Sequence, residues 1–168
     1  MLELYVFTFH NDGKIFRALS LLTPEQVDKV GLLTEAVLGD VGALLPSMTP
    51  DQFEQNEDFV AQLQAVVREF APQLPDLQTQ AKAQATGRVV VVDERAIGQG
   101  AEAVEDILGS FEVVRGELLP ERYTPNPHYR LLTDRGTLQL PALLEEQLLA
   151  RVATAVQMRL ASHSPADG

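Results

Sequence analysis

The chain opens with a pattern of apolar positions that predicts a β-hairpin. Residues 2–9 and 15–22 are rich in aromatic, β-branched and leucine side chains, and Asn11-Asp12-Gly13 lies between them. Asp-Gly supplies the positive φ angles that a tight reversal requires. Both faces of the first run are largely apolar, so we expect helices or a partner chain to cover both faces.

Two later boundaries between polar and apolar positions carry the signature of a helix start. Residues 23–26 (TPEQ) and 49–52 (TPDQ) each place Thr at the N-cap, Pro at the first helical position and Gln at the third. Apolar residues at helical spacing then predict one helix that ends near Pro46 and another that ends before Pro72. Asn56 is a second candidate cap that would divide the latter into two shorter helices. The residues beyond the two caps diverge, so we do not interpret them as an internal repeat.

The middle of the chain predicts a third helix and a strand–helix–strand unit. A polar stretch rich in Ala and Gln begins at Pro75, with Gly87 as its cap. The four valines 89–92 predict a central strand that is buried on both faces. A helix from Ala101 and a strand over 111–114 complete a βαβ-like unit.

The last third of the chain predicts a loop, a second hairpin and a long helix. Residues 115–135 begin as a proline-punctuated stretch with little periodicity. Gly136 lies where a hairpin turn needs a positive φ angle. A broad apolar stripe follows Pro141, which predicts a long C-terminal helix.

These elements predict a single α+β domain over residues 1–161, followed by a disordered tail over 162–168. Its mixed sheet would be built from the two hairpins and the βαβ-like unit. Five helices would cover the sheet, starting at Pro24, Pro50, Pro75, Ala101 and Pro141.

Composition narrows the classes of function. The chain has 168 residues, no cysteine and a formal net charge of −11. The missing cysteine excludes disulfides and thiolate chemistry. The negative charge disfavours general nucleic-acid binding and anionic membranes, because both depend on Lys and Arg. No signal peptide or membrane span is recognised, so we expect a soluble, cytoplasmic protein.

The first candidate site follows the four valines. In open α/β sheets, ligands bind beyond the carboxyl ends of strands. Asp93 and Glu94 lie there as candidate acid/base groups or metal ligands, with Arg95 and Gln99 as candidate binding groups. However, Gly98-Gln99-Gly100 is not a complete dinucleotide fingerprint and no P-loop lysine follows. We therefore interpret this stretch as scaffold rather than as a nucleotide site.

The second candidate site is the proline-punctuated stretch. It gathers residue types that dominate binding hot spots. They are Arg122, Tyr123, His128, Tyr129 and Arg130. The alternative is that the tyrosine rings anchor the stretch to the sheet while the arginines pair with nearby acids.

A metal site is not predicted and no cofactor is identified. Glu54, Glu57 and Asp58 fall within about one helical turn, and carboxylates suit Mg²⁺. The matched acidic pair on a second helix is missing, so a solvated acidic face is the better interpretation. The three histidines form no cluster along the chain.

Two functional hypotheses follow, and a third is weaker. The first is a non-enzymatic interaction or regulatory protein of a bacterial-type cytoplasm, which forms a homo-oligomer or binds a protein partner. The second is a small enzyme or ligand-binding protein that uses Asp93 and Glu94 with a metal or an anionic small molecule. The third is an acidic surface that mimics nucleic acid or neutralises a basic partner.

Overall fold

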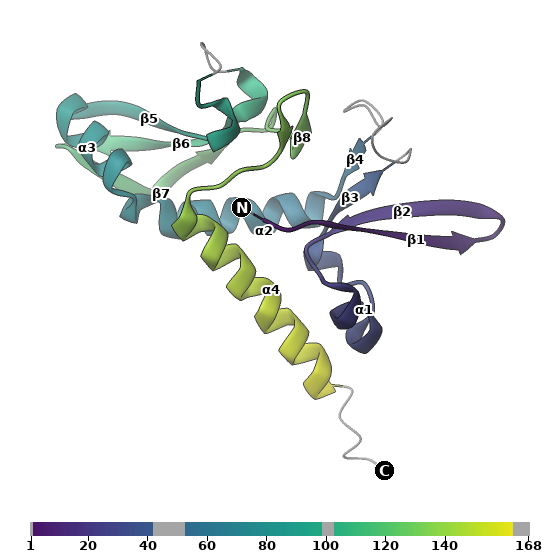
Figure 1. The fold of residues 1–168 in the computed structure, drawn as a ribbon. Helices are drawn as coiled ribbons and strands as arrows, with labels where there is room; N and C mark the ends of the chain where they lie inside the picture. The colour runs from purple at the N-terminus through teal and green to yellow at the C-terminus, as the bar shows by residue number, and fades with distance from the viewer. Residues whose placement is uncertain (1, 42–52, 99–102, 163–168) are drawn as a thin grey trace. The chain divides into compact units, whose positions relative to one another are not determined.

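A computed structural model describes residues 2–41, 53–98 and 103–162 of the protein (Figure 1). It confirms the α+β class, with antiparallel sheets and α-helices. The described residues contain four α-helices, where five were predicted. The chain divides into two compact units: an N-terminal unit of residues 2–62 and 148–168, and a central unit that contains residues 63–147. The single domain stays a prediction, and residues 163–168 of the expected tail lie outside the described residues.

The N-terminal unit contains a four-stranded antiparallel sheet in the order β1-β2-β3-β4. The strands are β1 (Tyr5–Asn11), β2 (Lys14–Ser20), β3 (Val37–Val41) and β4 (Phe53–Gln55). The predicted hairpin is confirmed as β1 and β2. Its two turn residues, Asp12 and Gly13, take φ angles of 51° and 75°, which is the positive-φ pair that a type I′ turn requires.

The first predicted helix begins where the capping box places it but is much shorter. In α1 (Pro24–Val30) the Gln26 amide donates to Thr23 Oγ1 at 3.2 Å, and the Thr23 amide donates to Gln26 Oε1 at 3.0 Å. The helix ends at Gly31, whose φ angle of 77° leaves the helical region. The apolar residues beyond it form β3 instead, so the prediction of a helix to Pro46 is wrong.

The second predicted helix also begins later than expected. Its cap at 49–52 lies outside the described residues, but the next three residues form β4 rather than a helical turn. The helix α2 (Glu57–Phe70) starts after Asn56, the candidate second cap, whose Oδ1 accepts from the Asp58 amide at 3.1 Å. Its end before Pro72 is confirmed.

The central unit contains a three-stranded antiparallel sheet and a small hairpin. The sheet has the order β5 (Thr86–Val92), β6 (Ile107–Val114) and β7 (Glu117–Pro125). The hairpin of β8 (Leu132–Thr133) and β9 (Gly136–Thr137) confirms the predicted second hairpin. The helix α3 (Pro75–Gln84) is confirmed, but Ala85 caps it and Gly87 lies in β5.

The βαβ-like unit is not formed. The valine strand exists, but it runs antiparallel to β6, and no strand of the described residues pairs with its other side. Val89 and Val91 are buried while Val90 is 41% exposed, so burial alternates along the strand instead of covering both faces. Ala101 lies outside the described residues, and the residues from Ala103 onward form a 3₁₀ turn and then β6. Much of the predicted loop at 115–135 is β7.

The C-terminal helix is confirmed as α4 (Ala142–Ser162), directly after Pro141. Its first six residues belong to the central unit and the remainder to the N-terminal unit. None of the helices in the described residues combines the length and the apolar character that crossing a bilayer requires.

The two units contain the same structural repeat. Repeat 1 is residues 14–58 of the N-terminal unit, and repeat 2 is residues 86–128 of the central unit. Each repeat consists of three antiparallel strands, β2-β3-β4 or β5-β6-β7, and a 3₁₀ turn precedes the middle strand. Each has a bulge just before the last residue of its first strand. Both helix caps, at 23–26 and 49–52, fall within repeat 1, so comparing them with each other could not find a repeat whose second copy begins at residue 86.

An asparagine at the end of each repeat makes the same hydrogen bonds. Asn56 Nδ2 donates to the carbonyl oxygens of Thr34 and Val37, both at 2.9 Å. The equivalent bonds in repeat 2 run from Asn126 Nδ2 to the carbonyl oxygens of Val104 and Ile107, both at 2.8 Å. Each asparagine therefore ties the final strand to the 3₁₀ turn and to the start of the middle strand.

A glycine in the middle strand of each repeat allows a close approach of the third strand. A Cβ atom on Gly39 would overlap the backbone of Glu54, and one on Gly109 would overlap Tyr123 and the Thr124 carbonyl. The two glycines lie seventy positions apart, as do the two asparagines. The same separation relates two aromatic pairs, Phe53 and Phe59 in repeat 1 and Tyr123 and Tyr129 in repeat 2.

Candidate binding site

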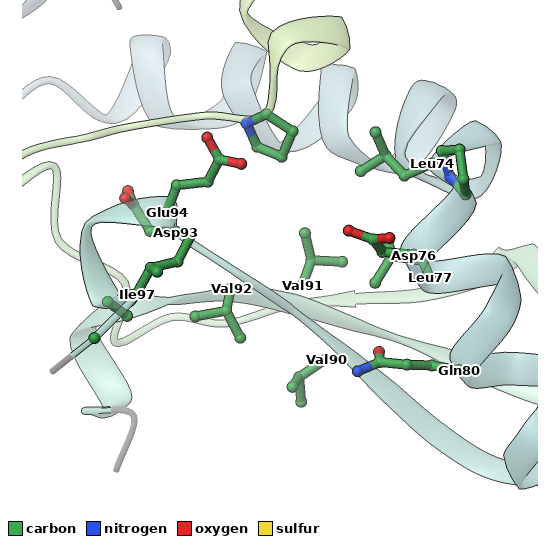
Figure 2. Close-up of a pocket in the computed structure, with 14 residues that line it drawn as sticks. Leu74, Asp76, Leu77, Gln80, Val90, Val91, Val92, Asp93, Glu94 and Ile97 are labelled. Atoms are coloured by element: carbon green, nitrogen blue, oxygen red, sulfur yellow. The ribbon is translucent and has the colours of Figure 1, made fainter. Parts of the chain in front are cut away.

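A pocket of about 640 Å³ opens in the central unit between α3 and the turn that follows β5 (Figure 2). Its lining comes from two stretches, residues between 74 and 80 and residues between 90 and 98, together with Pro141. The volume lies within the range of pockets that hold small molecules or short peptide segments.

The pocket runs along the free edge of a strand. Val90, Val91 and Val92 all line it, although consecutive side chains of a strand point to opposite faces. What the three residues share is the edge of β5, and within the described parts of the chain β5 pairs with β6 alone. At the start of β5 the Gln84 side chain already donates to the carbonyl oxygens of Thr86 and Arg88. The edge beyond Arg88, which lines the pocket, is where backbone N–H and C=O groups are open to a ligand. The four-valine run that adjoins this edge contains neither Lys nor Pro, the residues that commonly protect such edges.

The remaining walls are apolar and acidic. Figure 2 shows Asp76 and Gln80 on the α3 side and Glu94 and Ile97 on the opposite side. Ile97 is 74% exposed, an unusual exposure for a large apolar side chain. No Lys, Arg or His is among the residues that line the pocket. The pocket therefore suits a ligand that is apolar and positively charged, rather than an anion.

Asp93, a predicted catalytic candidate, is fully buried and holds the turn that forms one wall. Its Oδ1 accepts from the backbone amides of Arg95 at 2.9 Å and Gln139 at 3.0 Å. Its Oδ2 accepts from the Tyr129 hydroxyl at 2.6 Å. Burial and the adjacent Asp93 charge raise the pKa of Tyr129 well above its usual value. With three donors already bound, Asp93 acts as a structural anchor of the turn.

Arg95 is also buried, and every part of its guanidinium is used within the central unit. Nε donates to Asp106 Oδ1 at 2.7 Å, and the group lies 5.3 Å from the centre of the Tyr129 ring. The remaining donors bond to backbone carbonyl oxygens, those of Glu105, Arg130, Leu131 and Gly136. A buried charge with this many partners fixes the surrounding loops and has no donor left for a ligand.

Asp106 completes this cluster together with Arg135. Arg135 Nε donates to Asp106 Oδ2 at 2.7 Å. Burial alone would raise the pKa of Asp106, but the hydrogen bonds from Arg135 and Arg95 outweigh it and hold that pKa below its usual value. The hydrogen bond with Asp106 correspondingly raises the pKa of Arg135. We call Asp93, Arg95, Asp106, Tyr129 and Arg135 the buried ionic cluster.

The other predicted binding residues are dispersed. Arg122 is exposed, with its Nε 3.8 Å from a carboxylate oxygen of Glu112. The Tyr123 hydroxyl donates to Gln64 Oε1, and burial raises the pKa of Tyr123. His128 is exposed, and its backbone amide donates to the Asn126 side chain.

The remaining two predicted residues contribute little to a site. Arg130 reaches the buried ionic cluster through its carbonyl oxygen. Gln99 lies outside the described residues. Glu94 is therefore the one predicted site residue in the described part of the chain that is exposed on the pocket wall.

Several residues of the site were not predicted. Asp76, Gln80 and Ile97 line the pocket, and Asp106 and Arg135 belong to the buried ionic cluster. Their roles depend on β5 being an edge strand and on loops that lie far apart in the sequence, such as those of Asp106 and Arg135, 29 positions apart. Local periodicity does not report such contacts. The described residues contain no group of three or more His, Cys, Asp or Glu side chains that could hold a metal ion.

Comparisons of the chain with protein-family models, with curated proteins and with solved structures find no match. The functional argument therefore rests on the geometry of the pocket.

Proposed function

We propose that this is a non-enzymatic interaction or regulatory protein that binds an extended, basic segment of a protein partner along β5. The observation that carries the proposal is a free strand edge lying inside an apolar pocket whose ionisable lining groups are acidic. The absence of cysteine supports a reducing, cytoplasmic location for this binding.

The mode of binding is addition of a strand to the sheet. Main-chain hydrogen bonds to β5 would supply affinity, and alternate side chains of the segment would supply specificity. Apolar side chains would contact Ile97 and the valines, while Lys or Arg side chains would lie near Asp76 and Glu94. A second copy of the chain is a less suitable occupant, because a net charge of −11 on each copy opposes association.

The small-enzyme hypothesis receives less support. An anionic substrate would meet carboxylates and no cation in the pocket lining. Asp93 would have to give up hydrogen bonds to Arg95, Tyr129 and Gln139 before it could act on a substrate.

The test is titration of the protein with acetyl-Lys-Val-Arg-Val-Lys-amide, followed by calorimetry and by amide NMR. We expect saturable binding with shifts at β5 and α3. A peptide of the same sequence with N-methyl groups on alternate amides should bind weakly, because it lacks the donors that extend the sheet. Equal affinity for the two peptides, or shifts away from β5, would contradict the proposal.

Charge is tested separately with the double variant Asp76→Asn/Glu94→Gln. We expect the dissociation constant to rise by roughly 2- to 10-fold, since each partly exposed ion pair contributes up to about 1 kcal/mol. Glu121→Gln removes an exposed acid of β7 outside the pocket and serves as the matched control. Native mass spectrometry of the free protein then distinguishes a basic partner segment from a second copy of the chain as the occupant of the β5 pocket. A stable homodimer would favour the second copy.

A further inference from the structure

Repeat 2 holds a guanidinium group over two opposed residues of its sheet. Ser110 and Thr124 face each other across β6 and β7. Arg88 of β5 reaches over both: Nε donates to Ser110 Oγ at 3.0 Å, and Nη2 donates to Thr124 Oγ1 at 2.9 Å. Further bonds from Nη2 to the carbonyl oxygens of Ser110 and Arg122 complete its coordination. Repeat 2 therefore supplies its own cation over Ser110 and Thr124.

Repeat 1 has a pocket at the equivalent position, lined by two carboxylates. Asp40 and Glu54 are opposed across β3 and β4 just as Ser110 and Thr124 are across β6 and β7. Both line a pocket of about 270 Å³ in the N-terminal unit. Phe16 occupies the strand position that Arg88 has in repeat 2.

Aromatic rings line the same pocket. Phe9 and Phe16 are opposed across β1 and β2, and their rings stack with centroids 5.5 Å apart. Ala18, which is opposed to Asp40 across β2 and β3, lies between the rings and the carboxylates. A flat aromatic surface beside two carboxylates matches a planar cation, which stacks on rings and donates to two oxygens at once.

The two carboxylates form no ion pair of their own, although Arg17 also lines the pocket and its Nε is buried without a hydrogen-bond partner in the described residues. Like charges directly opposite each other in a sheet are destabilising. In the described residues no ion pair or hydrogen bond involves the side chain of Asp40 or Glu54. The neighbouring residues 42–52, which lie outside the described residues, include no Lys, Arg or His in their sequence. The chain thus places two acids where repeat 2 places a guanidinium and its neutral acceptors.

We propose that this pocket, the arginine pocket, binds the guanidinium of an arginine side chain from a protein partner. The carboxylates of Asp40 and Glu54 would accept its N–H groups, and the Phe9 and Phe16 rings would contact its flat face. Arginine is favoured over lysine because an ammonium group neither stacks nor donates in a planar fork. The arginine pocket lies in the N-terminal unit, whereas the β5 pocket lies in the central unit. The inference therefore does not depend on the proposed function.

The direct test is an amide NMR titration of the full chain with acetyl-Gly-Arg-Gly-amide. The matched control peptide carries citrulline, which has nearly the same shape as arginine but no charge. We expect saturable shifts at Gly39, Asp40 and Glu54 with the arginine peptide and none with the citrulline peptide. Equal shifts with both peptides, or no shift at these residues with either, would overturn the proposal.

The variant Glu54→Gln gives two readouts that a purely structural residue would not combine. Affinity for the arginine peptide should fall by about tenfold or more, since hydrogen bonds to charged groups are the strong ones. The melting temperature of the free protein should rise, because the opposed charges are relieved. Glu35→Gln removes an exposed acid of the same unit outside the pocket and should change neither. Unchanged affinity in Glu54→Gln would refute the site.

A second variant imitates repeat 2. Phe16→Arg places an arginine at the position of Arg88, so its guanidinium should fill the pocket from within the chain. We expect this variant to melt at a higher temperature and to lose binding of the arginine peptide, whereas Phe16→Leu should weaken binding without the gain in melting temperature. Peptide binding to Phe16→Arg at the affinity of the unsubstituted protein would contradict the inference. Should this variant fail to fold, the Glu54→Gln result decides.

Discussion

At the residue scale, the buried ionic cluster shows how the central unit accommodates charge away from water. Arg95 is neutralised by Asp106, and its other donors satisfy carbonyl oxygens from three separate loop regions. A buried ion pair of this kind contributes little net stability compared with apolar side chains, but loss of one member leaves an uncompensated charge. The cluster therefore specifies how the loops around the β5 pocket are arranged.

Asp106→Asn should be strongly destabilising. We expect a loss of roughly 3–5 kcal/mol in the free energy of unfolding, because Arg95 and Arg135 would share the cluster with Asp93 as its single remaining carboxylate. Urea denaturation at neutral pH measures the change. Glu94→Gln, an exposed neighbour of the same turn, should stay within about 0.5 kcal/mol of the unsubstituted protein. A similar small effect for Asp106→Asn would show that the cluster is not needed for folding.

The lowered pKa of Asp106 also predicts an acid dependence of stability. A carboxyl whose pKa is lower in the folded state stabilises the protein above its unfolded pKa of about 3.9. That contribution is lost as the pH falls through the lower folded-state value. The unsubstituted protein should therefore lose stability on acidification more steeply than Asp106→Asn in this range. Parallel curves from denaturation at a series of pH values would argue against this role.

Tyr129 predicts the opposite dependence at alkaline pH. Its raised pKa means that the folded state keeps the proton after the unfolded chain has lost it. Stability from this group is present below the unfolded pKa of about 10 and decreases as the pH rises above it. Tyr129→Phe should cost about 1–3 kcal/mol at neutral pH through the lost bond to Asp93, and its stability should fall less between about pH 10 and 11. Identical alkaline profiles would contradict the assignment.

At the scale of elements, sequence motifs correctly predicted the helix start and the turn whose structure depends on neighbouring residues alone. The capping box at 23–26 and the Asp12-Gly13 turn are correct because their hydrogen bonds and φ angles involve residues within a few positions of each other. The extent of the first helix was wrong because apolar residues after Gly31 fit either a helix face or a strand. Whether these residues form a helix or a strand depends on pairing with β2 and β4, which lie elsewhere in the sequence.

The repeat was missed because little of the sequence carries it. What repeats is a glycine in the middle strand and, seventeen positions later, an asparagine with an aromatic residue three positions before and after it. A search for that spacing would find both copies. The antiparallel pairing of β5 with β6, which places the candidate site on a sheet edge, depends on contacts that this spacing does not report.

The two asparagines should matter equally for their own repeats. Asn56→Ala and Asn126→Ala each remove three side-chain hydrogen bonds to the backbone. We expect each substitution to destabilise the protein by about 1–3 kcal/mol, because three hydrogen bonds of about 0.5–1.5 kcal/mol each are lost, some of them exposed to solvent. Gln62→Ala, which removes a single such bond, is the control and should cost less. Chemical denaturation of the three variants compares them.

At the scale of the whole molecule, charge and exposed apolar surface point to the same class of partner. The ionisable lining of the β5 pocket is acidic, that of the arginine pocket has two acids and Arg17, and the chain has 24 acidic against 13 basic residues. Such a protein attracts basic partners over a distance that salt shortens. The acidic excess and the pocket chemistry together favour partners rich in Lys and Arg.

Binding of the basic peptide at β5 should therefore weaken with ionic strength. Raising NaCl from about 50 mM to about 500 mM shortens the screening length severalfold. The dissociation constant should increase mainly through slower association, as expected for electrostatic steering. Stopped-flow or surface-based kinetics at several salt concentrations measures both rates. An affinity that does not change with salt would mean that the apolar contacts and the strand edge are sufficient.

The duplicated asparagine gives the molecule an internal reference. Both side-chain amides donate to a pair of carbonyl oxygens at nearly equal distances, so their NMR signals start from similar surroundings in the two units. One spectrum recorded during unfolding would follow the two signals in the same tube, under one set of conditions. Simultaneous loss would show that the units melt as one cooperative body, and separate loss would give the order in which they come apart.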